Sequence, residues 1–218
     1  SLNFGRAVGQ AHLGVSSLVA TPLAAGLAVL DPEERDIGVA LIDIGAGLTS
    51  IAVYRFGIPV GVATVPMGSA DITDDIAAAF ATRRSNAERL KTFDGAAVAT
   101  TRDQTDPVII PPAVDDGSAE PMKVPRAQLV TVIRTRLDMM FGEIARALSA
   151  LGFVGPQARR VVLTGGGADL RSIGEYAGTY LRCNVRIGRP RGLAGLPVAQ
   201  EGPAFAALAG LVLFAGAD

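Results

Sequence analysis

The stretch that decides the fold is LIDIGAGLTSIAVY, residues 41–54. It is typical of a buried strand that ends in an acid, Asp43, followed by a tight turn through Gly45 and Gly47 and then a second strand. Residues 39–44 are nearly all apolar, as in a strand covered on both faces. We expect Gly45 and Gly47 to adopt positive φ, so that the loop turns its backbone N–H groups toward a ligand.

An acid beside several N–H donors suits a metal-bound polyphosphate. The amides would hold phosphate oxygens and Asp43 would hold Mg²⁺ through water, while Thr49 and Ser50 add hydroxyl groups. A hairpin with a structural glycine turn and an exposed Asp43 explains this stretch about equally well, because a short glycine motif is weakly specific.

A second glycine turn follows a second apolar strand. Residues 159–163 predict this strand, Gly165, Gly166 and Gly167 follow Thr164, and a helix is predicted over about 168–181. A strand, a glycine turn and a helix in succession form a ligand-binding arrangement in α/β sheets. Glycines let a flat ring or a sugar approach the backbone, although a purely structural turn is the alternative. Two such turns, each after a buried strand, suggest one nucleotide held between them.

The remaining pattern predicts alternating strands and helices. We expect an antiparallel meander of strands at about 37–44, 49–56 and 58–66. A helix over 125–151 follows from apolar residues at helical spacing, from Leu129 to Leu148. The other predictions are helices at 2–14, 21–30, 69–81, 86–93 and 202–215, strands at 17–20, 108–110 and 185–187, a polar turn at 31–36 and a loop at 189–197.

Composition narrows the function. The 218 residues include 20 basic and 21 acidic side chains, so nothing argues for a nucleic-acid partner. Cys183 is the one cysteine and His12 the one histidine, which excludes an internal disulfide and a multi-histidine metal site. The single cysteine fits a reducing cytoplasm, and no signal peptide is visible. The apolar run at 202–217 is short for a membrane span, so we expect a buried helix.

Five segments carry a resemblance to a known family. Two of them resemble motifs of the actin, sugar-kinase and chaperone superfamily of ATP-binding folds. The stretch VALIDIGAGLTSIAVYRFG (39–57) looks like the second phosphate loop of that superfamily with its flanking strands, and RRVVLTGGGADLRSI (159–173) looks like its adenosine motif. Within it the chain most resembles the FtsA family of bacterial cell-division proteins. That resemblance rests on residues 67–97, residues 124–138 and the tail RIGRPRGLAGLPVAQEGPAFAALAGLVLF (186–214).

The resemblance implies an actin-like, ribonuclease H-like α/β fold, with a mixed sheet flanked by helices and a smaller α+β outer subdomain. Residues 1–67 and 152–218 would form the inner subdomain, and residues 68–151 the outer one. The chain would correspond to the second domain of such a protein. The family's first half, and the C-terminal amphipathic helix that binds membrane, would lie outside it.

The resemblance also implies residue roles. Asp43, Gly45, Gly47 and Thr49 would bind phosphate, with Asp43 reaching Mg²⁺ through water. Gly165, Gly166 and Gly167 would form the adenosine turn. Glu88 and Lys91, three apart on one predicted helix, would contact ribose and adenine, although an ordinary surface ion pair is the alternative. With half of the cleft outside the chain, we expect weak ATP binding.

By resemblance, the function is that of a cytoplasmic adaptor at the inner face of the membrane at the division site. It would bind ATP and the C-terminal tail of FtsZ, tether the division ring, contact other divisome proteins and be able to self-associate. Five arginines are candidate partners for carboxylates of the tail: Arg83, Arg84, Arg126, Arg134 and Arg136. For Arg126, Arg134 and Arg136, a solvated helix face is the simpler explanation.

The alternatives are an ATPase or kinase of the same superfamily, or another bacterial actin-like filament protein. Two departures weaken the enzyme alternative. Leu48 stands where the family's loop usually has Thr, and Thr21 stands where hydrolytic relatives place a Glu or Gln that positions water. Slow or absent hydrolysis is therefore the hypothesis.

Overall fold

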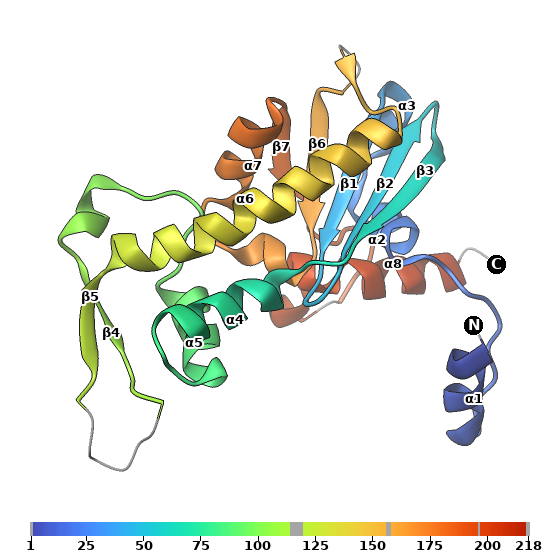
Figure 1. Ribbon diagram of the computed structural model, residues 1–218. Coiled ribbons are helices and arrows are strands. Elements are labelled where there is room, and N and C mark those ends of the chain that lie inside the picture. Colours follow the sequence, from blue (N-terminus) through green and yellow to red (C-terminus); the bar gives the residue numbers. More distant parts are fainter. Residues whose placement is uncertain (1, 114–119, 156–157, 196, 217–218) are drawn as a thin grey trace.

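The computed structural model describes residues 2–113, 120–155, 158–195 and 197–216. Its centre is a five-stranded sheet in the order β3-β2-β1-β6-β7 (Figure 1). The strands are β1 (Val39–Ile44), β2 (Thr49–Arg55), β3 (Ile58–Val65), β6 (Arg160–Thr164) and β7 (Asn184–Ile187). The antiparallel meander is confirmed, and β6 joins it parallel to β1, with β7 parallel to β6. This mixed sheet flanked by helices is the expected fold class.

The sheet register decides where the site lies. Asp43 pairs with Ser50 on one side and with Thr164 on the other. The loop after β1 and the loop after β6 therefore lie side by side, where the two parallel strands end. Ligands of α/β sheets bind at these carboxyl ends of the strands.

Helices cover both faces of the sheet. On one face, Leu41 and Ala52 pack with α2 (Thr21–Val29) and α8 (Ala206–Ala215). These two helices meet through small residues, including Ala24, Ala25 and Gly210. The opposite face, with Ile42, Ile44 and Ile51, packs against α6 (Arg126–Ala150) and α7 (Ile173–Leu181).

A smaller layer surrounds the first half of α6 (Figure 1). It contains α4 (Ser69–Ala79), α5 (Arg84–Phe93) and the antiparallel pair β4 (Pro107–Ile110) and β5 (Met122–Pro125). The 25-residue α6 contacts α4 and β5 here and β2 and β3 of the large sheet further along. The division into an inner and an outer subdomain stays a prediction, with α6 packed on both layers.

Several predicted elements are wrong in detail. No strand forms at 17–20, and residues 31–36 form most of a helix, α3 (Pro32–Ile37), in which the Glu34 side chain accepts the N–H of Asp31 at 3.0 Å. The strand β5 was not predicted. The helix expected from 168 is a short 3₁₀ turn, Gly166–Asp169, and α7 begins at Ile173 because Ser172 takes a left-handed φ of 61°.

Each end of the described chain carries a short helix. The short helix α1 (Leu2–Gln10) lies apart from the sheet in Figure 1, and the predicted C-terminal helix is a 3₁₀ turn, Pro203–Phe205, followed by α8. None of the helices that the structure describes combines the length and the apolar character needed to cross a bilayer.

Candidate functional site

The loop after β1 borders an open hollow of about 400 Å³. Its walls come from the start of α2, the end of β1, the loop that follows and the start of β2. The lining residues are Thr21, Asp43, Gly45, Ala46, Gly47, Leu48 and Ser50. Three of the four residues with a predicted phosphate or metal role line this hollow, and so does Thr21, where the resemblance led us to expect the water-positioning side chain of hydrolytic relatives.

Asp43 has the properties of an outer ligand for a cation. Its side chain is only 8% exposed, and within the described residues it forms no ion pair. Burial raises the pKa of this carboxyl group because the charged form loses its hydration. A hydrated Mg²⁺ beside it would compensate that cost. No cluster of three or more metal-binding side chains occurs among the described residues, so the ion's other ligands would be water and phosphate.

Hydrogen bonds within the loop after β1, and from the start of α4, hold that loop in place. The N–H of Gly45 donates to the Leu48 carbonyl at 2.9 Å, and the carbonyls of Gly45 and Ala46 accept the N–H groups of Ser69 and Ala70 at 2.9 and 2.8 Å. The first turn of α4 is thus capped by the loop. Among the described residues the N–H groups of Ala46 and Gly47 have no protein acceptor, so they are available to an anion.

The prediction that Gly45 and Gly47 adopt positive φ is wrong. Neither Gly45 nor Gly47 has a positive φ. Gly45 is required by close packing instead, because a Cβ there would lie 2.9 Å from the Leu48 carbonyl oxygen. Gly68, which the sequence did not single out, is more crowded still: a Cβ would overlap the carbonyl groups of Gly45 and Ala46.

Thr49 does not line the hollow. It is fully buried and its hydroxyl donates to the Met67 carbonyl at 2.8 Å. Successive side chains of a strand point to opposite faces, so when Thr49 faces the core its neighbour Ser50 faces the hollow. Of the two hydroxyl groups considered, Ser50 is the one placed to meet a ligand.

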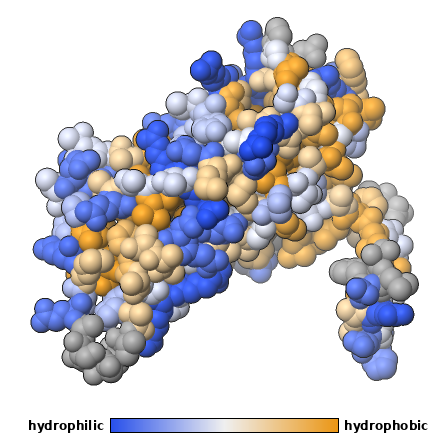
Figure 2. All heavy atoms as spheres, viewed as in Figure 1, coloured by the Kyte–Doolittle hydropathy of each residue, from blue (hydrophilic) through white to orange (hydrophobic). Residues whose placement is uncertain are grey.

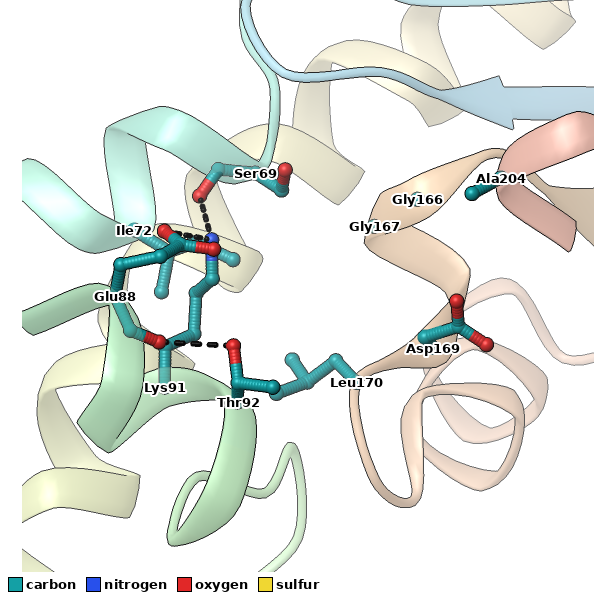
Figure 3. A pocket seen from close by; sticks show the side chains of 10 residues that line it. All are labelled: Ser69, Ile72, Glu88, Lys91, Thr92, Gly166, Gly167, Asp169, Leu170 and Ala204. Atoms are coloured by element: carbon teal, nitrogen blue, oxygen red, sulfur yellow. Dashed lines mark hydrogen bonds and ion pairs between the residues drawn. The ribbon is translucent and has the colours of Figure 1, made fainter. Parts of the chain in front are cut away.

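A second hollow of about 350 Å³ lies between the small layer and the loop after β6 (Figure 3). One wall comes from α4 and α5, and the other from the glycine turn and the following residues. The residues lining it are Ser69, Ile72, Glu88, Lys91, Thr92, Gly166, Gly167, Asp169, Leu170 and Ala204. The structure thus brings Glu88 and Lys91 opposite the second glycine turn, more than seventy residues away in sequence.

Glu88 and Lys91 belong to a hydrogen-bonded group, not to an isolated ion pair. The Lys91 ammonium donates to the Ser69 carbonyl at 2.9 Å and to the Thr73 hydroxyl at 2.8 Å, and lies 2.8 Å from the Glu88 carboxylate. Burial alone would raise the pKa of Glu88, but hydrogen bonds from Lys91 and Thr73 outweigh it and hold the pKa below its usual range. Glu88 remains charged and half exposed at the rim, where it can accept hydrogen bonds from ribose hydroxyl groups.

The three glycines of the second turn have different roles. Gly165 has φ of 84°, and a Cβ there would overlap Asp43 and the Ile44 carbonyl; a Cβ on Gly167 would overlap the Ile44 side chain. Both are buried and tie this turn to the end of β1. Gly166 is exposed, and the nearest atom to a Cβ there would be Ala204 Cβ at 3.8 Å. Gly166 is therefore the glycine that a ligand can approach.

The candidate partner arginines divide into two groups. Arg126 is mostly buried and lies 3.6 to 4.0 Å from Asp94, Asp103 and Asp106. Arg136 makes a bidentate pair with Asp75 at 2.6 and 2.7 Å, joining α6 to α4. Arg84 pairs with Asp74 at 2.6 Å on the surface. Arg83 and Arg134 form no ion pair within the described residues, although Arg83 donates to the Ala113 carbonyl.

Comparison with known proteins identifies a family and a fold. A family profile described as "Cell division protein FtsA" matches residues 40–210. The cell division protein FtsA of Agrobacterium fabrum is 40% identical over 97% of this chain and 48% of its own length. That of Escherichia coli K12 is 32% identical over 96% of this chain and 51% of its own length. The chain spans about half the length of the curated relatives it matches.

Solved structures show the same fold at lower identity. MreB5 of Spiroplasma citri bound to ADP matches with a TM-score of 0.74 and 18% identity, over 99% of this chain and 65% of that one. A PilM–PilN type IV pilus biogenesis complex matches with a TM-score of 0.68 and 23% identity, over 95% and 55%. The fold is actin-like, and the family profile covers most of the sequence. The chain belongs to the FtsA family of cell-division proteins.

Proposed function

We propose that this chain forms the ATP-binding and partner-binding half of a cell-division adaptor. One observation carries the nucleotide part: two hollows border the loops that leave the adjacent carboxyl ends of β1 and β6. One has free amides and a buried carboxylate, and the other has a glycine wall facing Glu88 and Lys91. A base and ribose would fill the hollow at Gly166, the phosphates would lie against Ala46 and Gly47, and Mg²⁺ would bind Asp43 through water.

Solved relatives support this proposal. The MreB5 structures were obtained with ADP and with AMPPNP, and they share the fold of nearly the whole chain. The two hollows of this chain contact a nucleotide from one side only, so we propose that this chain alone binds ATP weakly. Thr21 lines the phosphate hollow without a carboxylate, and we propose that ATP acts mainly as a conformational ligand, with slow or absent hydrolysis. Turnover of Mg-ATP at an ordinary enzymatic rate would favour the alternative, an ATPase or kinase.

Replacing Gly166 tests the nucleotide site without disturbing the fold. Gly166→Leu places a side chain into open space, so we expect an unchanged melting temperature and a fall in ATP affinity of about tenfold or more, equivalent to at least about 1.4 kcal/mol. Isothermal titration calorimetry at high protein concentration measures the affinity. Ala215→Leu, an exposed small-to-large change on α8, is the matched control. Equal ATP affinity in the two variants would exclude this hollow as the base site.

The partner part of the proposal is the C-terminal tail of FtsZ. In the family-wide role, the full-length protein would link FtsZ filaments and other divisome proteins to the inner face of the membrane. A short acidic and apolar tail needs accessible cations. Arg83 and Arg134 are the candidates whose charge is not already matched by a carboxylate among the described residues, whereas Arg126 and Arg136 hold α6 to its neighbours.

Charge reversal separates the two groups of arginines. We expect Arg134→Glu to weaken binding of a labelled tail peptide, measured by fluorescence anisotropy, with no change in melting temperature. Arg126→Glu places a carboxylate among Asp94, Asp103 and Asp106, and we expect it to destabilise the fold by about 3 kcal/mol or more. Saturable tail binding by Arg134→Glu at wild-type affinity would remove Arg134 from the proposed surface.

A further inference from the structure

Lys91 is a cation whose ammonium group is enclosed by the fold. Hydrophilic residues are spread over the outer surface of the small layer (Figure 2), whereas the Lys91 side chain is only 11% exposed. Its ammonium group meets three oxygen atoms, which belong to the Ser69 carbonyl, the Thr73 hydroxyl and the Glu88 carboxylate. A lysine side chain has three N–H donors and no acceptor. Those three oxygens therefore use the whole donor capacity of Lys91, and no N–H remains for a ligand in the hollow beside it.

Two of these oxygens belong to α4, so Lys91 ties α5 to the start of α4. The partners lie 22 and 18 residues before Lys91, which makes the link a tertiary contact between the two helices. Figure 3 shows the ammonium group beside Ser69 and Glu88, on the wall of the hollow that α4 and α5 form. Lys91 therefore serves as a clamp between two helices, and its charge is already matched by Glu88.

The same turn of α4 holds the loop after β1. The N–H groups of Ser69 and Ala70 donate to the carbonyls of Gly45 and Ala46 at 2.9 and 2.8 Å. Gly68, just before α4, has no space for a Cβ against those carbonyl groups, so the helix and the loop are in direct contact. A shift of the first turn of α4 must therefore move the loop that borders the phosphate hollow.

We propose that Lys91 is a positioning residue for the nucleotide, and that it acts through α4 without touching the ligand. It holds the first turn of α4 against the loop after β1, and thereby keeps the N–H groups of Ala46 and Gly47 in place for phosphate oxygens. The inference rests on the proposed nucleotide site. It gives the two members of the expected ribose and adenine pair separate tasks, because Glu88 is half exposed at the rim and can meet the ligand itself.

Hydrogen exchange in the ligand-free protein tests the link between Lys91 and the loop. The first N–H groups of a helix have no acceptor within it, so protection of the Ser69 and Ala70 amides depends on the loop carbonyls. Lys91→Met keeps a stem of similar length and removes the ammonium group. We expect these two amides to exchange about tenfold faster or more, measured by NMR relative to amides in the middle of α6, which report global stability. Lys123→Met, at the exposed lysine of β5, is the control.

Calorimetric titration with two ligands tests the positioning role itself. Lys91→Met should lower the affinity for Mg-ATP about tenfold or more, the loss found when a group that orients binding groups is removed, and leave the affinity for adenosine nearly unchanged. A general weakening of the fold would lower both affinities alike, so their ratio isolates the positioning role. Glu88→Ala should lower both affinities by the same factor, because it removes a contact to the part that the two ligands share.

A milder variant keeps the test available if Lys91→Met does not fold. Thr73→Val removes one of the two links to α4 at similar volume and should show the same pattern to a smaller degree. Unchanged exchange at Ser69 and Ala70, or an equal loss of adenosine and Mg-ATP affinity in Lys91→Met, would overturn the role of Lys91. A wild type that binds no Mg-ATP would instead overturn the proposed nucleotide site, and the exchange measurement would still decide whether Lys91 holds the loop.

Discussion

Gly210→Ala should destabilise the protein by about 1–3 kcal/mol, although the substitution replaces a glycine inside a helix. Helix propensity alone would make alanine about 1 kcal/mol more stable at this position. Packing reverses the sign, because a Cβ on Gly210 would overlap the backbone carbonyl of Ala24 on α2. That obstacle is main chain, so no rotamer change relieves it, and α2 and α8 must separate along the face that covers Leu41 and Ala52.

Gly142→Ala is the matched control. Gly142 lies within α6, where the nearest atom to a new Cβ is the Tyr180 hydroxyl oxygen at 3.4 Å, an ordinary contact. Because no clash opposes the higher helix propensity of alanine, the Gly142→Ala variant should equal or exceed the wild type in stability. Urea unfolding of the three proteins measures the difference in the free energy of unfolding. A Gly210→Ala variant as stable as Gly142→Ala would mean that the two helices do not approach each other as described.

Asp43→Asn should have opposite effects on stability and on ligand binding. Without ligand, we expect the variant to melt at a higher temperature than the wild type at neutral pH, since it lacks the buried charge. With Mg-ATP, the magnesium-dependent part of the affinity should fall by up to about 100-fold, the range found when a group supporting a metal site is lost. Thermal melts and calorimetry with and without Mg²⁺ measure both effects.

The pH dependence of this difference follows from the raised pKa of Asp43. In the unfolded chain the carboxyl group ionises near pH 4, and in the folded protein it ionises at a higher pH. The wild type therefore loses stability as pH rises through the interval between these two pKa values. The variant's advantage in stability should vanish below about pH 4 and reach a constant value above the folded-state pKa of Asp43. Asp36→Asn, at an exposed carboxylate, is the control for the loss of one negative charge.

The elements that could be predicted are those whose signal is local. Apolar runs bounded by glycine turns predicted β1, β2 and β6, and the spacing from Leu129 to Leu148 predicted α6, where eight apolar side chains are buried. α3 was missed because it is six residues long and polar, with no buried face. β5 was missed because a four-residue strand depends on its partner β4 for stability.

The site was predictable in its residues more than in their roles. The sequence places Asp43, Glu88, Lys91 and the glycines among candidates, but the reason for each glycine depends on atoms distant in sequence. Gly167 is required by Ile44, and Gly68 by Ala46, neither of which a local pattern reveals. Likewise the three aspartates around Arg126, namely Asp94, Asp103 and Asp106, lie well before it in the sequence, so sequence alone could not show that this arginine is already paired in the fold.

The order of the strands has a consequence for synthesis of the chain on the ribosome. β1 pairs with β2 almost as soon as both exist, but its other edge is covered by β6, about 115 residues later. At 5–20 residues per second, that edge of a buried strand, apolar except for Asp43, stays unpaired for roughly ten seconds. The nascent protein thus carries an unprotected hydrophobic edge, suited to capture by a chaperone, until translation has passed the second glycine turn.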